Sequence, residues 1–360
     1  MTIIVNKDYA LPMRSWMKSI GAALLVAFMA VGLYTIYINW TNSGDPANPN
    51  PTLTREGEMG KIKVVTSTNV WASVVEIVGG EWVEVTAIID DPMQDPHSYE
   101  ASARDQLAVS EADLVIANGG GYDDFLTQLV EASEGERIFL KLVEGEHIHA
   151  GEAHAGEAHS GEAHSEEGHG HEHGEEHGHE HGHDHEHGNE HIWYELEMVA
   201  KAADMIKESI IELRPESSAA VTEKYDFFIS ELANLEIRIE AVRERTQGTG
   251  FLATEGVGNL LLEDAGFTNQ TPEALADAVE EETEVPATAL KRAQDLIRNG
   301  LISVLVVNQQ VTDQVSEQLE RLAISEGVPV LKLSELITDP NQDYLDWMAS
   351  ILDQLQEAVY

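Results

Sequence analysis

The chain has 360 residues, with 21 Lys and Arg against 65 Asp and Glu, 16 His and no Cys, so its formal net charge is −44. This charge excludes a nucleic-acid-binding protein, because phosphate contacts need a basic surface, and it attracts cations. The absence of Cys excludes disulfides, thiolate metal sites and an acylated lipoprotein anchor. The length predicts two domains, and 42% hydrophobic residues are enough for a core.

An apolar run without charges extends from Ile20 to Ile38 and follows Lys7, Arg14 and Lys18. A helix of this length rises about 1.5 Å per residue and just crosses a hydrocarbon core about 30 Å thick. The preceding basic residues place its N-terminal end in the cytoplasm. We therefore predict that residues 1–60 form a cytoplasmic stub, an uncleaved membrane anchor and a flexible tether. A cleaved signal peptide is the alternative.

Residues 61–143 alternate strand-like and helix-like patterns, as parallel βαβ units do. The predicted strands are KIKVVTS, WVEVTAII and DLVIANGGG, and the predicted helices are NVWASVVEIVGG, ARDQLAVSEA and YDDFLTQLVEAS. Residues 247–360 resume strand character at GFLATEG and form a second α/β lobe that ends in a helix from Asp343. Between the lobes, residues 191–246 are predicted to be helical, with a long helix from Pro215 that would reach across two lobes.

Residues 144–190 break this pattern with a segment of His, Glu and Gly that contains almost no apolar residue. We predict a disordered loop, since such a composition cannot offset the entropy of ordering. Imidazoles and carboxylates suit Zn²⁺, Ni²⁺ and Cu²⁺, so the loop would bind several ions weakly. Its candidate ligands are His147, His149, His154, His159, His164, His169, His171, His173, His177, His179, His181, His183, His185 and His187.

No catalytic signature stands out, so we predict that the chain is not an enzyme. The segment from His179 to His183 matches H-E-x-x-H, but that protease signature needs a helix, and this segment is interrupted by Gly. The segment NGGGY lacks the spacing of a phosphate-binding loop and is better explained as a tight strand-to-helix turn. An extracellular zinc hydrolase and a metal buffer or adhesin remain as alternatives.

Three residues outside the His-rich loop lie where an α/β sheet binds ligands. His97 stands in D-P-H, on a loop that follows a predicted strand, and Glu255 and Glu335 follow strand-like runs of the second lobe. Ligands of open α/β sheets bind beyond the carboxyl ends of the strands. A neutral imidazole at such a position is a good ligand for a borderline metal ion.

Over roughly Lys61 to Tyr360, the chain resembles the metal-binding subunits of zinc/manganese ABC importers, the ZnuA-like family. The resemblance rests on VVTSTNVWASVVEIVGG, DPHSYEASARDQLAVSEADLVIANGGGYDDF, EHIWYELEMVAKAADMI, TEGVGNLLLEDAGF, PATALKRAQDLI and DYLDWMASILDQL. It implies an α/β fold with two Rossmann-like parallel-sheet lobes, joined by a long rigid helix, and a single metal site between them.

The resemblance also implies the ligands of that site. They fall on His97, on His191 in the H-x-W segment, on Glu255 and on Glu335. The third ligand is usually His in zinc members and often Glu in manganese members, so this ligand set leaves Mn²⁺, or Fe, open beside Zn²⁺. Zn²⁺ is favoured, because the His-rich loop suits it and Mn²⁺ binds most weakly in the affinity order.

Three acids are candidates to hold the second ring nitrogens of these imidazoles. They are Asp95 and Glu100 for His97, and Glu190 for His191. The predicted protein is a monomeric, extracytoplasmic solute-binding protein that delivers Zn²⁺ to an ABC permease, with a cytoplasmic ATPase driving uptake. Since ligation needs neutral imidazole, its affinity for the ion is expected to fall below about pH 6.

Overall fold

The computed structural model describes residues 60–143, 189–281, 283–311 and 313–359. Met1–Gly60 and Lys61–Tyr360 are separate units, and all the described helices and strands belong to the second. The predicted anchor at Ile20–Ile38 and the fourteen histidines of the His-rich segment lie outside the described residues and stay predictions. Among the described helices, none combines the length and the apolar character that a membrane span requires.

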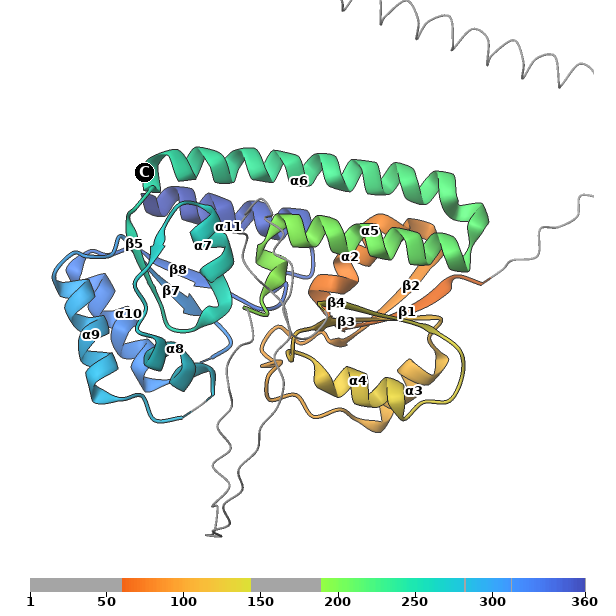
Figure 1. The fold of residues 1–360 in the computed structure, drawn as a ribbon, viewed down its shortest axis with the longest axis horizontal. Coiled ribbons are helices and arrows are strands. Elements are labelled where there is room, and N and C mark those ends of the chain that lie inside the picture. Colours follow the sequence, from red (N-terminus) through yellow and green to blue (C-terminus); the bar gives the residue numbers. More distant parts are fainter. Residues whose placement is uncertain (1–59, 144–188, 282, 312, 360) are drawn as a thin grey trace, which may run out of the picture. The chain divides into compact units, whose positions relative to one another are not determined.

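The first half of the described chain forms a four-stranded parallel sheet in the order β2-β1-β3-β4. Its inner strands are apolar and buried, as expected of a parallel sheet covered on both faces. Helices α3 and α4 cover one face, and α2 and α5 cover the other (Figure 1). The elements are β1 (Ile62–Thr68), α2 (Asn69–Gly79), β2 (Val83–Ile89), α3 (Ala103–Glu111), β3 (Leu114–Gly119), α4 (Asp124–Glu131), β4 (Ile138–Val143) and α5 (Leu196–Leu213).

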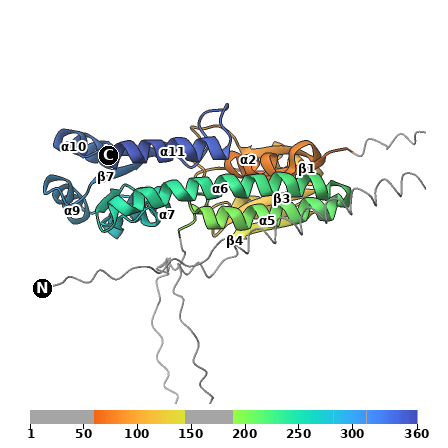
Figure 2. The same cartoon turned by 90° about the horizontal axis from the view of Figure 1, so that it is seen from above.

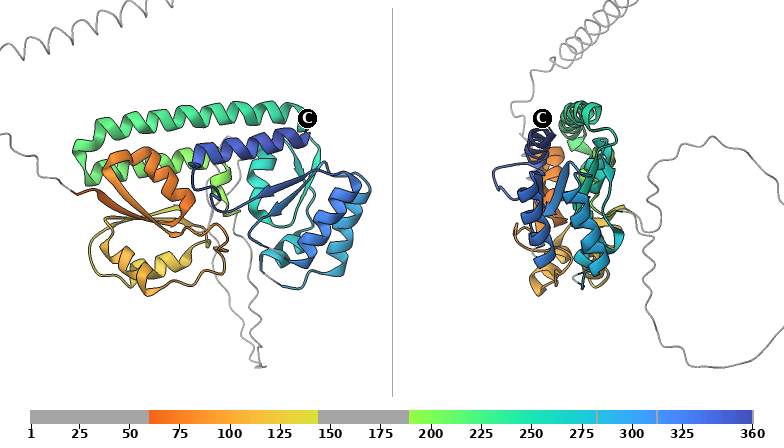
Figure 3. Two further views of the ribbon diagram at one scale, coloured as in Figure 1. Left: turned by 180° about the vertical axis from the view of Figure 1, so that it is seen from behind. Right: turned by 90° about the vertical axis from the view of Figure 1, so that its left-hand side faces the viewer.

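The second half repeats the arrangement with a sheet in the order β6-β5-β7-β8, again parallel throughout. Helices α9 and α10 lie on one side of this sheet, and α7 and α11 on the other (Figures 1 and 3). The elements are β5 (Gly250–Ala253), α7 (Asn259–Asp264), β6 (Thr268–Asn269), α8 (Glu273–Glu280), α9 (Ala287–Arg298), β7 (Val304–Asn308), α10 (Gln314–Glu326), β8 (Val330–Leu333) and α11 (Tyr344–Val359).

A single long helix, α6 (Ser218–Thr246), connects the two sheets. Its 29 residues make it about 44 Å long. It packs against α2 and α5 of the first lobe and against α11, as Figure 2 shows from above. Its buried side chains are spaced by seven residues once and then by three or four, so they share one face of the helix, and all but the last are apolar: Val221, Phe228, Leu232, Leu235, Ile239, Val242 and Thr246.

Hydrogen bonds between distant parts of the chain join the two lobes next to the strand ends. The side chain of Asn69, at the start of α2, exchanges two hydrogen bonds of 3.0 Å with the backbone of Ile337. Tyr194 donates to the carbonyl of Ser334 over 2.7 Å. The loops that follow the strands are therefore held close together.

The prediction of two parallel-sheet α/β lobes with a long connecting helix is confirmed. Two boundaries differ. The helical segment predicted from residue 191 begins as α5 only at Leu196, because Ile192–Tyr194 forms a 3-10 turn whose three side chains are buried. Likewise, Pro215 opens a 3-10 turn before α6 rather than α6 itself.

Candidate metal centre

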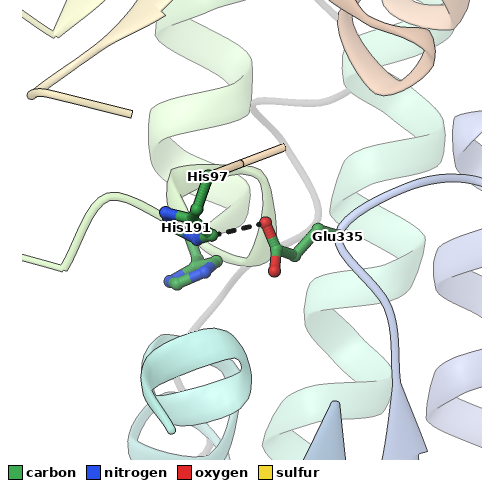
Figure 4. A group of neighbouring side chains, drawn as sticks. All are labelled: His97, His191 and Glu335. Carbon is green, nitrogen blue, oxygen red and sulfur yellow. Dashed lines mark ion pairs between the residues drawn. The ribbon is translucent and has the colours of Figure 1, made fainter. Parts of the chain in front are cut away.

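Three side chains from distant parts of the sequence meet at the carboxyl ends of the strands. Each of His97, His191 and Glu335 offers one potential ligand atom, and the three atoms lie within 4.8 Å of one another (Figure 4). His97 Nε2 is 3.4 Å from Glu335 Oε2. Donors around a tetrahedral ion with bonds of about 2.1 Å are about 3.4 Å apart, so this spacing fits such an ion.

Glu335 follows β8 and is completely buried. Its Oε1 accepts a hydrogen bond from Asn308 Nδ2 over 2.8 Å, and its Oε2 accepts one from the hydroxyl of Tyr122 over 2.9 Å. Tyr122 belongs to the first lobe and Glu335 to the second, so this contact orients the carboxylate from across the lobe boundary. Burial favours the neutral form of Glu335, but the hydrogen bond and the charge of His97, with the hydrogen bond from Tyr122, hold its pKa below the ordinary value.

Tyr122 owes its position to the Gly-rich turn after β3. Gly119, Gly120 and Gly121 all have positive φ, between 69° and 99°. A Cβ at Gly119 would lie 2.1 Å from the carbonyl oxygen of Val143, so only Gly fits there. The segment NGGGY is therefore a tight strand-to-helix turn that brings Tyr122 to the centre.

His191 is buried, with 2% of its surface exposed. Its ring Nδ1 lies 2.9 Å from Asn189 Oδ1, which can only accept, so Nδ1 carries the hydrogen. The other nitrogen, Nε2, is then a free acceptor, and it has no hydrogen-bond partner among the described residues. A buried acceptor without a partner is costly, and a metal ion would satisfy it.

The backbones of the two histidines are held by the same kind of local hydrogen bond. Asp95 Oδ1 accepts from the backbone N–H of His97 over 2.9 Å, and Asn189 Oδ1 accepts from the backbone N–H of His191 over 2.9 Å. In each case the Asp or Asn stands two residues before the His and closes a turn. Asp95 thus supports the backbone of His97 rather than its ring.

Glu190 lies beside His97, not beside Nδ1 of His191 as predicted. Its Oε1 is 3.4 Å from His97 Nδ1, so the imidazole of His97 stands between Glu190 and Glu335. The contact expected of Glu190 with His191 is made by Asn189. Glu100, the third acid predicted to support these imidazoles, is exposed on the loop before α3.

Glu255, the predicted third ligand, is 2% exposed and follows β5. It lies outside the cluster of three, although its charge interacts with Glu335 and His97. Its Oε1 is buried and has no hydrogen-bond partner among the described residues. Burial, followed by the charge of Glu335, raises the pKa of Glu255 to about 8. The hydrogen bond of its carboxyl group with Asn308 opposes this rise only in part.

The imidazoles have opposite electrostatic surroundings. Burial works against a charge on His97, but the hydrogen bond and charge of Glu335, followed by the charge of Glu190, raise its pKa to about 10. Burial lowers the pKa of His191 to about 4. Burial also raises the pKa of Glu190 to about 7. Among the described residues, His97 supplies the ion pairs of Glu190 and Glu335, and the protons on His97 and Glu255 offset part of the negative charge of the site.

Four residues of the centre were missed by sequence reasoning: Tyr122, Asn189, Asn308 and Glu280. Asn189 could have been found, since it stands two residues before His191 just as Asp95 does before His97. Asn308 is the polar end of a buried strand. Glu280, at the end of α8, carries no motif. It is recognisable only in the structure, where its charge interacts with those of His97 and Glu335.

Replacing Asn189 by Ala is expected to weaken the tightest metal binding by about 10–100-fold, because His191 would lose the group that fixes its tautomer and ring. Replacing it by Asp keeps the acceptor for His191 and loses only the bond from Nδ2 to the carbonyl of Gly256, now 2.7 Å. The Asp variant should therefore bind more tightly than the Ala variant. Competition against a chromophoric chelator measures both, and equal affinities would contradict this role of Oδ1.

Comparison with curated proteins finds short matches. The manganese-binding lipoprotein MntA of Halalkalibacterium halodurans is 41% identical over 71 residues, which make up 19% of this chain and 23% of that protein. The match therefore spans about a quarter of the relative's length. It gives no overall comparison of the two proteins.

Solved structures match over nearly their whole length. The periplasmic zinc-binding protein TroA from Treponema pallidum superposes with a TM-score of 0.64 at 15% identity, covering 83% of this chain and 99% of that one. A manganese-bound mutant of a periplasmic metal-binding protein from Candidatus Liberibacter asiaticus gives a TM-score of 0.60 at 17% identity, covering 83% and 100%. These similarities show the same fold.

The family model for the periplasmic component A of the zinc-uptake complex, ZnuA, matches residues 64–358. This range takes in both sheets, the connecting helix and every residue of the centre described above. The resemblance noted in the sequence is confirmed, and the chain belongs to the ZnuA family, whose members are solute-binding proteins of ABC importers and not enzymes.

Proposed function

We propose that this protein captures a divalent metal ion, Zn²⁺ in preference to Mn²⁺, between its two lobes and delivers it to a membrane permease. The observation that carries the proposal is the meeting of His97, His191 and Glu335, with a buried Nε2 on His191 that has no partner within the described part of the chain. Two imidazoles and one carboxylate would bind the ion directly, and Glu255 would complete a four-ligand site by a small movement of its side chain.

The burial of these groups supports an ion as the occupant. Glu255 and Glu335 are both nearly inaccessible, and His97 supplies the ion pairs that the structure shows for Glu335 and Glu190. Carboxylates in a buried site need a compensating charge. A divalent ion supplies that charge, and its binding displaces the protons that fill this role in its absence.

Zinc is proposed for two reasons. The donor set of two nitrogens and two carboxylates suits a tetrahedral Zn²⁺ site. Binding of Zn²⁺ to such a set is also stronger than binding of Mn²⁺ in the general order of affinities. Manganese is the alternative, because bidentate carboxylates would raise the coordination number, and because relatives are named for manganese.

The place of the protein in the cell follows from its family and from the predicted anchor. We propose an extracytoplasmic protein that is held to the membrane by the Ile20–Ile38 segment and works with a permease and a cytoplasmic ATPase. Release from the membrane after cleavage of that segment is the alternative. The predicted His-rich loop at residues 144–190 would bind further ions at low affinity.

Native mass spectrometry and elemental analysis of protein purified without chelator test the proposal. We expect one tightly held Zn²⁺ per chain, and in competition we expect Zn²⁺ to be preferred over Mn²⁺ by more than about a hundredfold. Tight Mn²⁺ that Zn²⁺ does not displace would contradict the choice of metal. Unchanged metal uptake in the His97→Ala variant would favour a metal buffer or adhesin instead.

A further inference from the structure

A polar cavity adjoins the metal centre on the side of α8. It has a volume of about 530 Å³. One wall is the segment from Asn189 to His191, and another is the face of α8 that carries Glu273, Asp277 and Glu280. His191 therefore belongs both to the cluster of three ligands and to the wall of this cavity, so its side chain lies between the cavity and the centre.

The face of α8 that lines this cavity is unusual in its charge. Glu273, Asp277 and Glu280 are spaced four and three residues apart, so they share one face of the helix. Like charges at this spacing destabilise a helix, and the sequence from Gly266 to Leu290 contains no Lys or Arg that could offset them. Of the described residues that line the cavity, none is Lys or Arg.

The carboxylates form a series of increasing burial that leads to the centre. Glu273 and Asp277 are exposed, and Glu280 is half-buried. Glu280 receives a hydrogen bond from the backbone of Gly256, and its Oε2 and His191 Nδ1 both lie close to that glycine. Glu190 comes next, with its side chain 17% exposed and its Oε1 3.4 Å from His97. The series ends at His191, whose buried Nε2 lacks a partner among the described residues.

We infer that this cavity is a capture site that takes a hydrated divalent cation from solvent and passes it to the centre, with Glu273, Asp277, Glu280 and Glu190 as successive oxygen ligands. This inference rests on the proposed function. Carboxylates alone bind divalent ions weakly and keep water on them, which suits rapid transfer. A cavity of this volume accommodates an ion with its water shell. A cavity lined by carboxylates also raises the local concentration of cations and the rate at which they associate.

The test is a stopped-flow measurement of Zn²⁺ binding to the full chain at low ionic strength. Trp193 reports on the centre, because its ring centroid is 5.3 Å from that of His191. In the double variant Glu273→Gln/Asp277→Asn, we expect the association rate constant to fall about tenfold. A capture site on the path lowers the barrier for entry and for exit of the ion, so its loss should lower the dissociation rate constant by a similar factor. The equilibrium affinity should therefore change less than about threefold.

A matched control removes the same two charges elsewhere. Glu223→Gln/Asp226→Asn lies on the exposed side of α6 and should leave both rate constants unchanged. An unchanged association rate in the α8 variant would overturn the inference, and so would an equal loss in both variants, which would reflect net charge alone. If instead the unaltered chain shows no saturable tryptophan signal with Zn²⁺, the proposed function itself fails.

Discussion

Replacing Glu335 by Gln is expected to weaken the tightest Zn²⁺ binding by more than about a hundredfold, above the 10–100-fold that follows the loss of a supporting residue. The variant removes a ligand and also the partner of His97 Nε2, now 3.4 Å away. The amide oxygen can still accept from Asn308 Nδ2, and the Tyr122 hydroxyl can turn to accept from the amide NH₂ group, so the fold should persist. Competition with a chromophoric chelator measures the affinity, and thermal unfolding followed by circular dichroism checks the fold.

Glu326→Gln is the control, because Glu326 is an exposed acid at the end of α10 and lies outside the centre. It should bind Zn²⁺ as the unaltered chain does. If Glu335→Gln kept the original affinity while folding normally, Glu335 would not be a ligand. The site would then have to be built from the imidazoles and Glu255 alone.

The affinity for the ion is expected to rise steeply with pH between 7 and 10, a higher range than the sequence predicted. In the metal-free protein the pKa of His97 is about 10 and that of Glu255 about 8, so both hold protons at pH 7. A raised pKa means that the proton competes with the ion at every pH below it. His191, with a pKa of about 4, is already neutral and releases none.

Binding at pH 7 should therefore expel about two protons per ion, one from each of these groups. The affinity should rise about a hundredfold per pH unit up to about pH 8, about tenfold per unit up to about pH 10, and then level off. Isothermal titration calorimetry in two buffers with different ionisation enthalpies counts the protons. Release of less than half a proton at pH 7, or a constant affinity between pH 7 and 9, would contradict the arrangement of His97 and Glu335.

The parts of the fold that the sequence predicts best are those with strong local patterns. The apolar strands and the amphipathic helices of both lobes appear where expected, and Pro215 begins the turn that leads into the connecting helix. The shortest strand was missed. This strand, β6, has only two residues, and its pairing with β5 is what makes it a strand. Such a strand has no periodicity from which to predict it.

The residues of the metal centre also divide into those that the sequence indicates and those that it does not. His97, His191 and Glu335 stand beside recognisable segments, and the structure brings these three together, with Glu255 outside the group. Residues that support them from other parts of the fold could not be predicted, since their roles depend on which loops become neighbours. Tyr122 reaches Glu335 across the lobe boundary, and Glu280 approaches from a helix without a motif. Their partners lie far away in the sequence.

The connecting helix also determines how a captured ion can leave. Between Ser218 and Thr246 there is neither Gly nor Pro, and one apolar stripe runs the whole length of the helix, so bending it would expose core side chains to water. A wide hinge motion of the lobes is therefore disfavoured. His97, by contrast, sits on a surface loop with its side chain 25% exposed, close in sequence to Met93, which is 74% exposed. We therefore expect that movements of this loop, which carry His97 away from the ion, set how long the ion stays bound. The other proposed ligands, His191, Glu255 and Glu335, would keep their positions.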